Sequence, residues 1–198
     1  MTLGVGQFCT NPGLTIVDGT AGLEPFMAQL AGLVSGSPGA TMLNPSISAA
    51  YDSGADSLGR NAAVETVALG QAGDCPCQAE AALYRTSADA FLSDASLGAE
   101  LFGPSTLLVT HDSPGKMLAL ARSLEGQLTA TVHGTETDLE ANRELFDVLV
   151  ESGEAVGVDA EKVVREQRPI GLGVAVDQCL PHLLLEVDEV LGLRACHG

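Results

Sequence analysis

The chain has 198 residues, 45% of them hydrophobic, with 23 glycines and no tryptophan, which supports one ordinary domain with a tail rather than a disordered chain. Its 26 acidic residues outnumber 9 basic ones, for a formal charge of −17, and this negative field excludes nucleic acid as a partner. Without an apolar run of about 18 residues we expect no membrane partner, and five cysteines, an odd number, fit free thiols in a reducing, cytoplasmic compartment.

Hydrophobic periodicity predicts alternating strands and helices over the first 150 residues. Short apolar, β-branched runs bounded by glycine, proline or aspartate predict strands, and apolar residues every three or four positions predict helices. In chain order these are a strand at 14–17, helices at 23–34 and 46–62, strands at 65–69, 81–85 and 105–110, a helix at 116–126, a strand at 128–133 and a helix at 136–150. This alternation predicts an α/β fold, a mainly parallel sheet with helices on both faces.

Two predicted helices show the face that they should bury. The residues at this spacing are Phe26, Leu30 and Leu33 or Val34 in the first helix, and Leu139, Arg143, Phe146 and Val150 in the last. Gly126 is expected to end the helix at 116–126. The segment 95–105 follows neither period and reaches a turn signal just before a strand, a place where loops often carry function.

The pattern of alternating strands and helices changes after residue 150. We predict a divergent tail of unassigned fold at 151–198, with a short charged helix around 159–168, a glycine-rich apolar run at 170–176 and an amphipathic stretch at 182–193. The first domain is expected to cover 1–150.

Cys9 is the residue whose role matters most. Cysteine is among the most buried residue types and often acts as a small hydrophobe. Here, Gly4 and Gly6 allow close backbone approach, while Pro12 and Gly13 force a turn directly after the thiol. Such a turn can present a side chain and its backbone N–H to a substrate, as oxyanion stabilisation requires.

Two motifs resemble a known family. "GQFCT" at 6–10 resembles the Gly-Gln-x-Cys-Thr motif around the catalytic cysteine of the aldehyde dehydrogenase superfamily, and "ELFGP" at 100–104 resembles that superfamily's Glu-x-Phe-Gly-Pro motif. The stretches "TMLNPSISAAYDSG" at 41–54 and "SLEGQLTATVHG" at 123–134 resemble its subgroup that oxidises α-ketoglutarate semialdehyde, or 2,5-dioxovalerate, and related fatty aldehyde enzymes. The resemblance covers about residues 4–150, which would then be a partial catalytic-like domain.

The resemblance implies roles for three residues. Cys9 would be the nucleophile whose thiolate adds to the aldehyde, its own N–H forming part of the oxyanion hole. Glu100 would accept hydrogen bonds from the nicotinamide ribose of NAD or NADP, and Phe102 would pack near the nicotinamide. The implied reaction oxidises an aldehyde to the acid through a Cys9 thioester.

The chain also departs from the family pattern. No counterpart is visible for the family's cofactor domain, for its oxyanion-hole asparagine or for the glutamate that activates the deacylating water. We therefore expect a fragment that turns over little alone. Its expected partners are a small-molecule aldehyde and either a second copy of the chain or a complementary cofactor domain.

Other candidates remain open. Cys75-Pro76-Cys77 lacks further ligands at zinc spacing, so a loop is expected there and no metal. His133 could form a cofactor-independent hydrolase dyad with Cys9, although a histidine at the edge of the core is the simpler interpretation; His111, His182 and His197 are scattered, and Cys179 and Cys196 have no assigned role. The alternatives to a dehydrogenase are thus a non-catalytic fragment or interaction module and a cysteine hydrolase.

Overall fold

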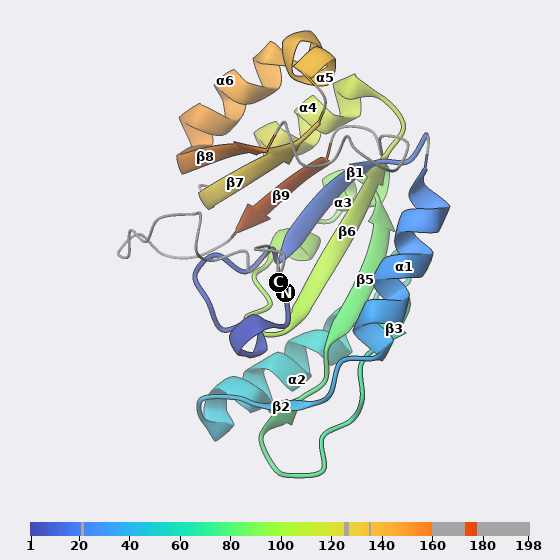
Figure 1. Cartoon of the computed structure of the whole chain (residues 1–198), viewed down its shortest axis with the longest axis vertical. Coiled ribbons are helices and arrows are strands. Elements are labelled where there is room, and N and C mark those ends of the chain that lie inside the picture. Colours follow the sequence, from blue (N-terminus) through green and yellow to red (C-terminus); the bar gives the residue numbers. More distant parts are fainter. Residues whose placement is uncertain (21, 125–126, 135, 160–172, 178–198) are drawn as a thin grey trace, which may run out of the picture.

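In the computed structural model, which describes residues 1–20, 22–124, 127–134, 136–159 and 173–177, one large sheet organises the chain (Figure 1). Within these residues it has seven strands in the order β3-β5-β6-β1-β9-β7-β8. Their bounds are β1 (Leu14–Asp18), β3 (Glu65–Leu69), β5 (Ala82–Ser87), β6 (Ser105–His111), β7 (Gln127–His133), β8 (Gly153–Asp159) and β9 (Gly173–Asp177). The short strands β2 (Ala40–Thr41) and β4 (Gln78–Ala79) form a separate pair.

Most strands of the large sheet run in one direction. β6 is parallel to both β5 and β1, and β7 is parallel to β8. β9 lies antiparallel between β1 and β7, so β7 and β8 share the direction of β1, while β3 is antiparallel to β5. The predicted mainly parallel α/β sheet is confirmed.

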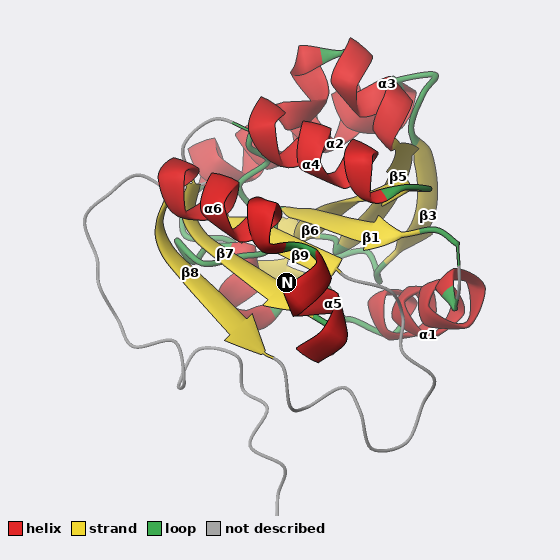
Figure 2. Cartoon of the chain, turned by 90° about the horizontal axis from the view of Figure 1, so that it is seen from above, coloured by secondary structure: helices red, strands yellow, loops and turns green. Residues whose placement is uncertain are grey.

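Helices cover both faces of the sheet (Figure 2). Their bounds are α1 (Leu23–Ser35), α2 (Pro45–Arg60), α3 (Ala88–Ser93), α4 (Pro114–Ser123), α5 (Glu136–Ala141) and α6 (Arg143–Ser152), with 3-10 helices η1 (Leu3–Gly6) and η2 (Ala95–Gly98). Leu14 and Ile16 of β1 pack with α3, α4 and α6, whereas Val17 packs with α1 on the other face. Side chains alternate across a strand, so β1 contributes to both layers of core.

Local signals fix α2, the helix that contains most of the stretch 41–54. Asn44 caps α2, its side-chain oxygen accepting from the backbone N–H of Ile47 at 2.9 Å, and Pro45 occupies the first turn. Tyr51 of α2 is buried in a third apolar cluster with Met42 and Ala79. This cluster attaches α2 to the N-terminal segment.

The helix at 136–150 is not continuous. The structure has α5 and α6 there, and α6 buries Leu145 and Leu149. Phe146 is only partly buried, Arg143 is exposed and Val150 is 63% exposed, so the predicted face is wrong for Arg143 and Val150. The buried residues of α6 thus lie one position before the predicted Phe146 and Val150.

Smaller differences occur elsewhere. Leu33 of α1 is 68% exposed, and Val34 takes the buried position with Leu23 and Met27. α4 ends at Ser123, earlier than expected, and Gly126 lies outside the described residues.

Two strands of the sheet come from the segment after residue 150. β8 takes up 153–159, and β9 takes up most of the glycine-rich run predicted at 170–176. The charged helix predicted around 159–168 falls, after Asp159, outside the described residues, as does the amphipathic stretch at 182–193. The domain boundary at residue 150 therefore stays a prediction.

Candidate active site

The segment before Cys9 bends through unusual backbone conformations. Gly4, Val5 and Gly6 have φ of +56°, +59° and +64°. A β-branched residue such as Val5 rarely adopts this left-handed region, because its Cβ crowds the backbone. Packing supports the strained residue, since Val5 contacts the apolar cluster of Met42 and Tyr51.

Cys9 itself lies inside a turn. The backbone N–H of Asn11 donates to the carbonyl of Phe8 at 3.1 Å, which leaves Cys9 and Thr10 at the centre of the bend. A second short contact follows, from the Gly13 N–H to the Asn11 carbonyl at 2.7 Å. The thiol is free and half-buried, and within the described residues its backbone N–H donates to no other group.

The turn with Cys9 packs directly against the second motif. The Asn11 side-chain amide donates to the carbonyl oxygen of Gly103 at 3.2 Å. Gly6 lies so close to Gly103 and Pro104 that an added Cβ would overlap the Gly103 carbonyl. β1 and β6 run parallel from this point, which places both motifs at the amino ends of neighbouring strands (Figure 1).

Gly103 is enclosed on its other side as well. A Cβ there would overlap the ring of Tyr51. That ring is fixed in turn, because the Tyr51 hydroxyl donates to the Glu80 carbonyl at 2.7 Å. Burial, the largest cause, raises the pKa of Tyr51 well above its usual value, so this hydroxyl stays protonated.

Glu100 and Phe102 flank a residue that anchors their loop. Leu101 packs against the cluster around Tyr51, whereas Glu100 is exposed and Phe102 is half-buried. Partial burial raises the pKa of the Glu100 carboxyl. Among the described residues, no hydrogen bond or ion pair holds this carboxylate, so it is available to a ligand.

Gln7 ties the first motif to a third segment. Its side-chain oxygen accepts from the Leu43 N–H at 2.9 Å, and its amide donates to the Gly4 carbonyl at 3.2 Å. Leu43 belongs to the stretch 41–54 that resembles the semialdehyde subgroup. All three segments that carry the resemblance around Cys9 therefore meet in one place.

Sequence reasoning missed the residues that join these segments. Asn11 and Leu101 were not singled out, although both lie within or beside the motifs. The available signals were the amide of Asn11, two residues after the cysteine, and the apolar Leu101 between Glu100 and Phe102. Neither reveals its partner, since the partners are distant in sequence.

The paired cysteines lie elsewhere. Cys75 is exposed, and Cys77 is half-buried with φ of +66° in a loop whose Cys75 N–H donates to Gln78 Oε1 at 3.2 Å. The described part of the chain contains no cluster of three metal-ligating side chains.

His133 does not approach Cys9. It is the last residue of β7 and is level, through Gly173 of β9, with Val17 near the carboxyl end of β1. Cys9 precedes the amino end of β1, so the two residues lie at opposite ends of the parallel strands. Candidates Cys179, His182, Cys196 and His197 fall outside the described residues.

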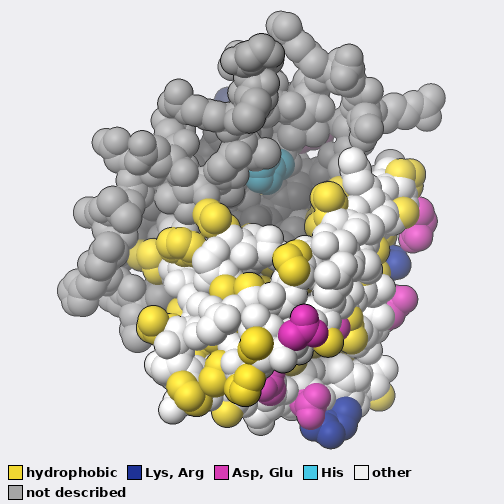
Figure 3. All heavy atoms as spheres, turned by 60° about the horizontal axis from the view of Figure 1, so that its bottom comes forward, with side chains coloured by type: hydrophobic (Ala, Val, Ile, Leu, Met, Phe, Trp, Pro, Cys, Tyr) yellow, Lys and Arg dark blue, Asp and Glu magenta, His cyan; other side chains and the backbone are white. Residues whose placement is uncertain are grey.

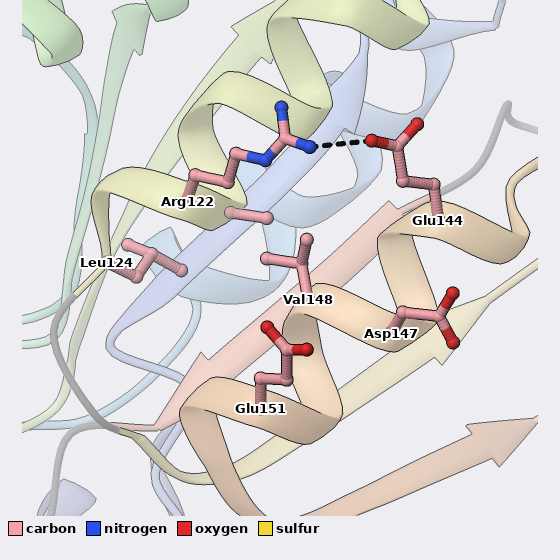
Figure 4. Close-up of a pocket in the computed structure, with 7 residues that line it drawn as sticks. Arg122, Leu124, Glu144, Asp147, Val148 and Glu151 are labelled. Atoms are coloured by element: carbon pink, nitrogen blue, oxygen red, sulfur yellow. Dashed lines mark hydrogen bonds and ion pairs between the residues drawn. The ribbon is translucent and has the colours of Figure 1, made fainter.

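A hollow between α4 and α6 has a different character (Figure 4). It has a volume of about 420 Å³, and Arg122 and Glu144 form an ion pair of 2.6 Å across it. Asp147 and Glu151 line the same hollow. A group of acidic side chains does not by itself indicate a ligand, and the described lining of this hollow offers no other feature that does.

The comparisons with known proteins agree with this geometry, although no family model matches the chain. It is 38% identical over 149 residues to alpha-ketoglutaric semialdehyde dehydrogenase 2 of Azospirillum brasilense, and 32% identical over 148 residues to alpha-ketoglutaric semialdehyde dehydrogenase of Acinetobacter baylyi. These matches take in 75% and 74% of this chain, but only 28% of each relative. The chain thus spans under a third of the curated relatives that it matches.

Solved structures show the same fold. Succinic semialdehyde dehydrogenase from Streptococcus pyogenes, determined in complex with NADP+, matches 88% of this chain and 40% of its own, with a TM-score of 0.62 and 16% identity. The fold and the paired motifs define a chain of the aldehyde dehydrogenase class. It belongs to that superfamily, and the curated relatives reported above are alpha-ketoglutaric semialdehyde dehydrogenases. Among the described residues, no helix is long and apolar enough to cross a membrane.

Proposed function

We propose that Cys9 is the nucleophile in the NAD(P)-dependent oxidation of a semialdehyde such as 2,5-dioxovalerate, or of an aliphatic aldehyde, to the acid. The observation that carries this proposal is the contact between the Cys9 turn and the Glu100–Phe102 loop through Asn11 and Gly103. The names of the curated relatives support the choice of substrate.

The residues of the turn have definite tasks in this chemistry. The Cys9 thiolate adds to the aldehyde carbon and forms a C–S bond, and the carbonyl oxygen becomes an oxyanion. The Cys9 N–H, which has no acceptor among the described residues, donates to that oxygen, because a preformed donor stabilises charge as it develops. Once the adduct has been oxidised to a thioester, water releases the acid and the free thiol.

Glu100 and Phe102 fit a dinucleotide in their exposure and chemistry. An exposed carboxylate without a partner in the described part of the chain can accept from ribose hydroxyls, and a half-buried ring offers an apolar face. Glu100 and Phe102 would hold NAD or NADP, which would supply the hydride acceptor for the oxidation.

We further propose that the purified chain turns over little by itself. It spans 28% of the relatives' length, and large apolar side chains are exposed next to the site: Leu3, Phe8 and Leu43 are 60%, 45% and 80% exposed. Figure 3 shows hydrophobic side chains across this end of the molecule. A complementary cofactor domain or a second copy of the chain would cover such side chains.

Acylation by p-nitrophenyl acetate tests the nucleophile without needing the cofactor. The Cys9 sulfur attacks the acetyl carbon, p-nitrophenolate leaves, and one acetyl group remains on the protein. Peptide mass spectrometry should find it on Cys9, and Cys9→Ser should abolish it, while Cys75→Ser should not. Acetylation spread equally over Cys75 and Cys77 would contradict the proposal, and rapid repeated turnover would favour the cysteine hydrolase instead.

Calorimetric titration with NAD+ and NADP+ tests the cofactor part separately. We expect no micromolar binding to the purified chain and no reduced nicotinamide when α-ketoglutaric semialdehyde is added. Tight binding, or turnover by the chain alone, would show that it needs no complementary domain.

A further inference from the structure

A second pocket lies at the carboxyl ends of the parallel strands, opposite the end at which Cys9 lies. It has a volume of about 260 Å³ and lies where β1, β5 and β6 end, as its lining shows: Gly19, Thr20, Leu23, Arg85, Ser87, Ala88, Asp89, Thr110, His111, Asp112 and Lys116. Binding pockets commonly start at roughly 300 Å³. This pocket therefore has room for a molecule of a few heavy atoms.

The topology explains why a crevice opens there. β1 and β6 are adjacent and parallel, but β1 leads into α1 on one face and β6 leads into α4 on the other. Helices that leave neighbouring strands toward opposite faces open a crevice at the carboxyl ends of the strands. In open parallel sheets, ligands commonly bind at such a point.

His111 lines this pocket with a buried polar side chain. This residue ends β6 and is buried, with only 6% of its surface exposed, and among the described residues neither imidazole nitrogen has a partner at hydrogen-bond geometry. Buried polar atoms are nearly always paired, so an unpaired pair of nitrogens indicates a missing donor or acceptor. Burial lowers the pKa of His111, against the opposing influence of the Asp18 carboxylate, a backbone contact at Ser113 and the Asp112 carboxylate. The neutral ring has one N–H donor and one acceptor, so the contact at Ser113 can engage only one of its two nitrogens.

Charge selects the kind of ligand. Within the described part of the chain, Glu24 is the one ionic partner of Arg85, at 3.6 Å, and the Glu24 side chain is 80% exposed. Lys116, in contrast, already contacts Asp89 at 2.8 Å and Asp112 at 3.1 Å. The Arg85 guanidinium therefore keeps hydrogen-bond donors to spare, and its planar fork matches a carboxylate.

We propose that this pocket binds a small organic carboxylate, with Arg85 as its ionic partner and the His111 imidazole as a hydrogen-bonding partner. The start of α4, which lacks a side-chain cap, adds positive potential. The Asp89 and Asp112 carboxylates disfavour a doubly charged anion. The proposal does not depend on the role of Cys9, which lies across the sheet.

Nuclear magnetic resonance of the full chain tests the proposal with acetate as the probe. We expect saturable shifts of the Gly19, Thr20 and Ser87 amides and of the His111 ring resonances. Arg85→Gln should weaken acetate binding at least about tenfold. Arg122→Gln, which removes an exposed arginine from the other end of α4, should leave it unchanged, and unchanged amide spectra of both variants would show that they fold.

Three further outcomes decide the ligand class. Absence of saturable shifts, or shifts equal in wild type and Arg85→Gln, would overturn the proposal. Saturation by inorganic phosphate but not by acetate would show that the ligand class is wrong. Saturation by methylammonium in place of acetate would show that the sign of the charge is wrong.

Discussion

The Asn11 side chain donates to the Gly103 carbonyl at 3.2 Å, across 92 positions of sequence. This bond joins the turn that carries Cys9 to the loop that carries Glu100 and Phe102. The contact is close because Gly6 has no side chain to separate its backbone from that of Gly103.

Asn11→Ala should lower the rate of Cys9 acylation more than it lowers stability. We expect a loss of about 1 kcal/mol in the free energy of unfolding, as for a typical hydrogen bond, because the Gly103 carbonyl keeps its bond from the Ser105 N–H at 2.8 Å. Asn142→Ala is the matched control, since Asn142 also donates from its side chain to a carbonyl, that of Asp138, at 2.8 Å. Equal acylation rates in both variants would contradict a positioning role for Asn11.

Gly103→Ala should destabilise the fold by about 1–3 kcal/mol, because the new methyl group would meet the Tyr51 ring. Gly115→Ala in α4 is the control, where a Cβ meets nothing within 4 Å. That change should be neutral or stabilise by up to about 1 kcal/mol. Urea unfolding of both variants measures the difference, and similar midpoints would mean that Gly103 is not tightly enclosed.

The pH dependence of stability should carry a contribution from His111. Burial lowers its folded pKa below the ordinary 6.5, so the unfolded chain binds more protons around this pH. The free energy of unfolding should then rise with pH through about 6.5 and fall as the solution is acidified. Urea unfolding between about pH 5 and 8 should show this trend in wild type and a weaker one in His111→Phe. An equal slope in both would contradict it.

Arg122→Ala should change stability by less than about 1 kcal/mol, because the ion pair with Glu144 in Figure 4 is exposed and screened. Leu120→Ala, two positions earlier in α4, should cost about 2–5 kcal/mol, since Leu120 is fully buried. Thermal unfolding compares them. A larger loss for Arg122→Ala would mean that the α4–α6 contact depends on charge rather than on apolar burial.

The local pattern of the sequence was enough to predict the strands from β1 to β7 that have a clear apolar run. The strand at 65–69 has its predicted bounds, and the glycine and proline boundaries placed the others within a few residues. Two features depended on tertiary contacts instead. β9 lies between β1 and β7, far from both in sequence, and the helix predicted at 136–150 divides into α5 and α6, with Leu145 and Leu149 as the buried residues of α6.

The candidate site was predictable only as separate pieces. The motifs singled out Cys9, Glu100 and Phe102, because each belongs to a short recognisable pattern. The left-handed Val5 and the enclosure of Gly103 by Tyr51 were not predictable, since they arise from packing between distant segments.

The most direct test of the central claim is the rate at which iodoacetamide alkylates each cysteine across pH, followed by peptide mass spectrometry. Cys75, an exposed cysteine of the same chain, is the internal reference, because the thiolate is the form of a cysteine that reacts. A nucleophilic Cys9 should react faster than Cys75 at neutral pH despite being half-buried. If Cys9 is alkylated no faster than Cys75 at any pH, it is not an activated nucleophile.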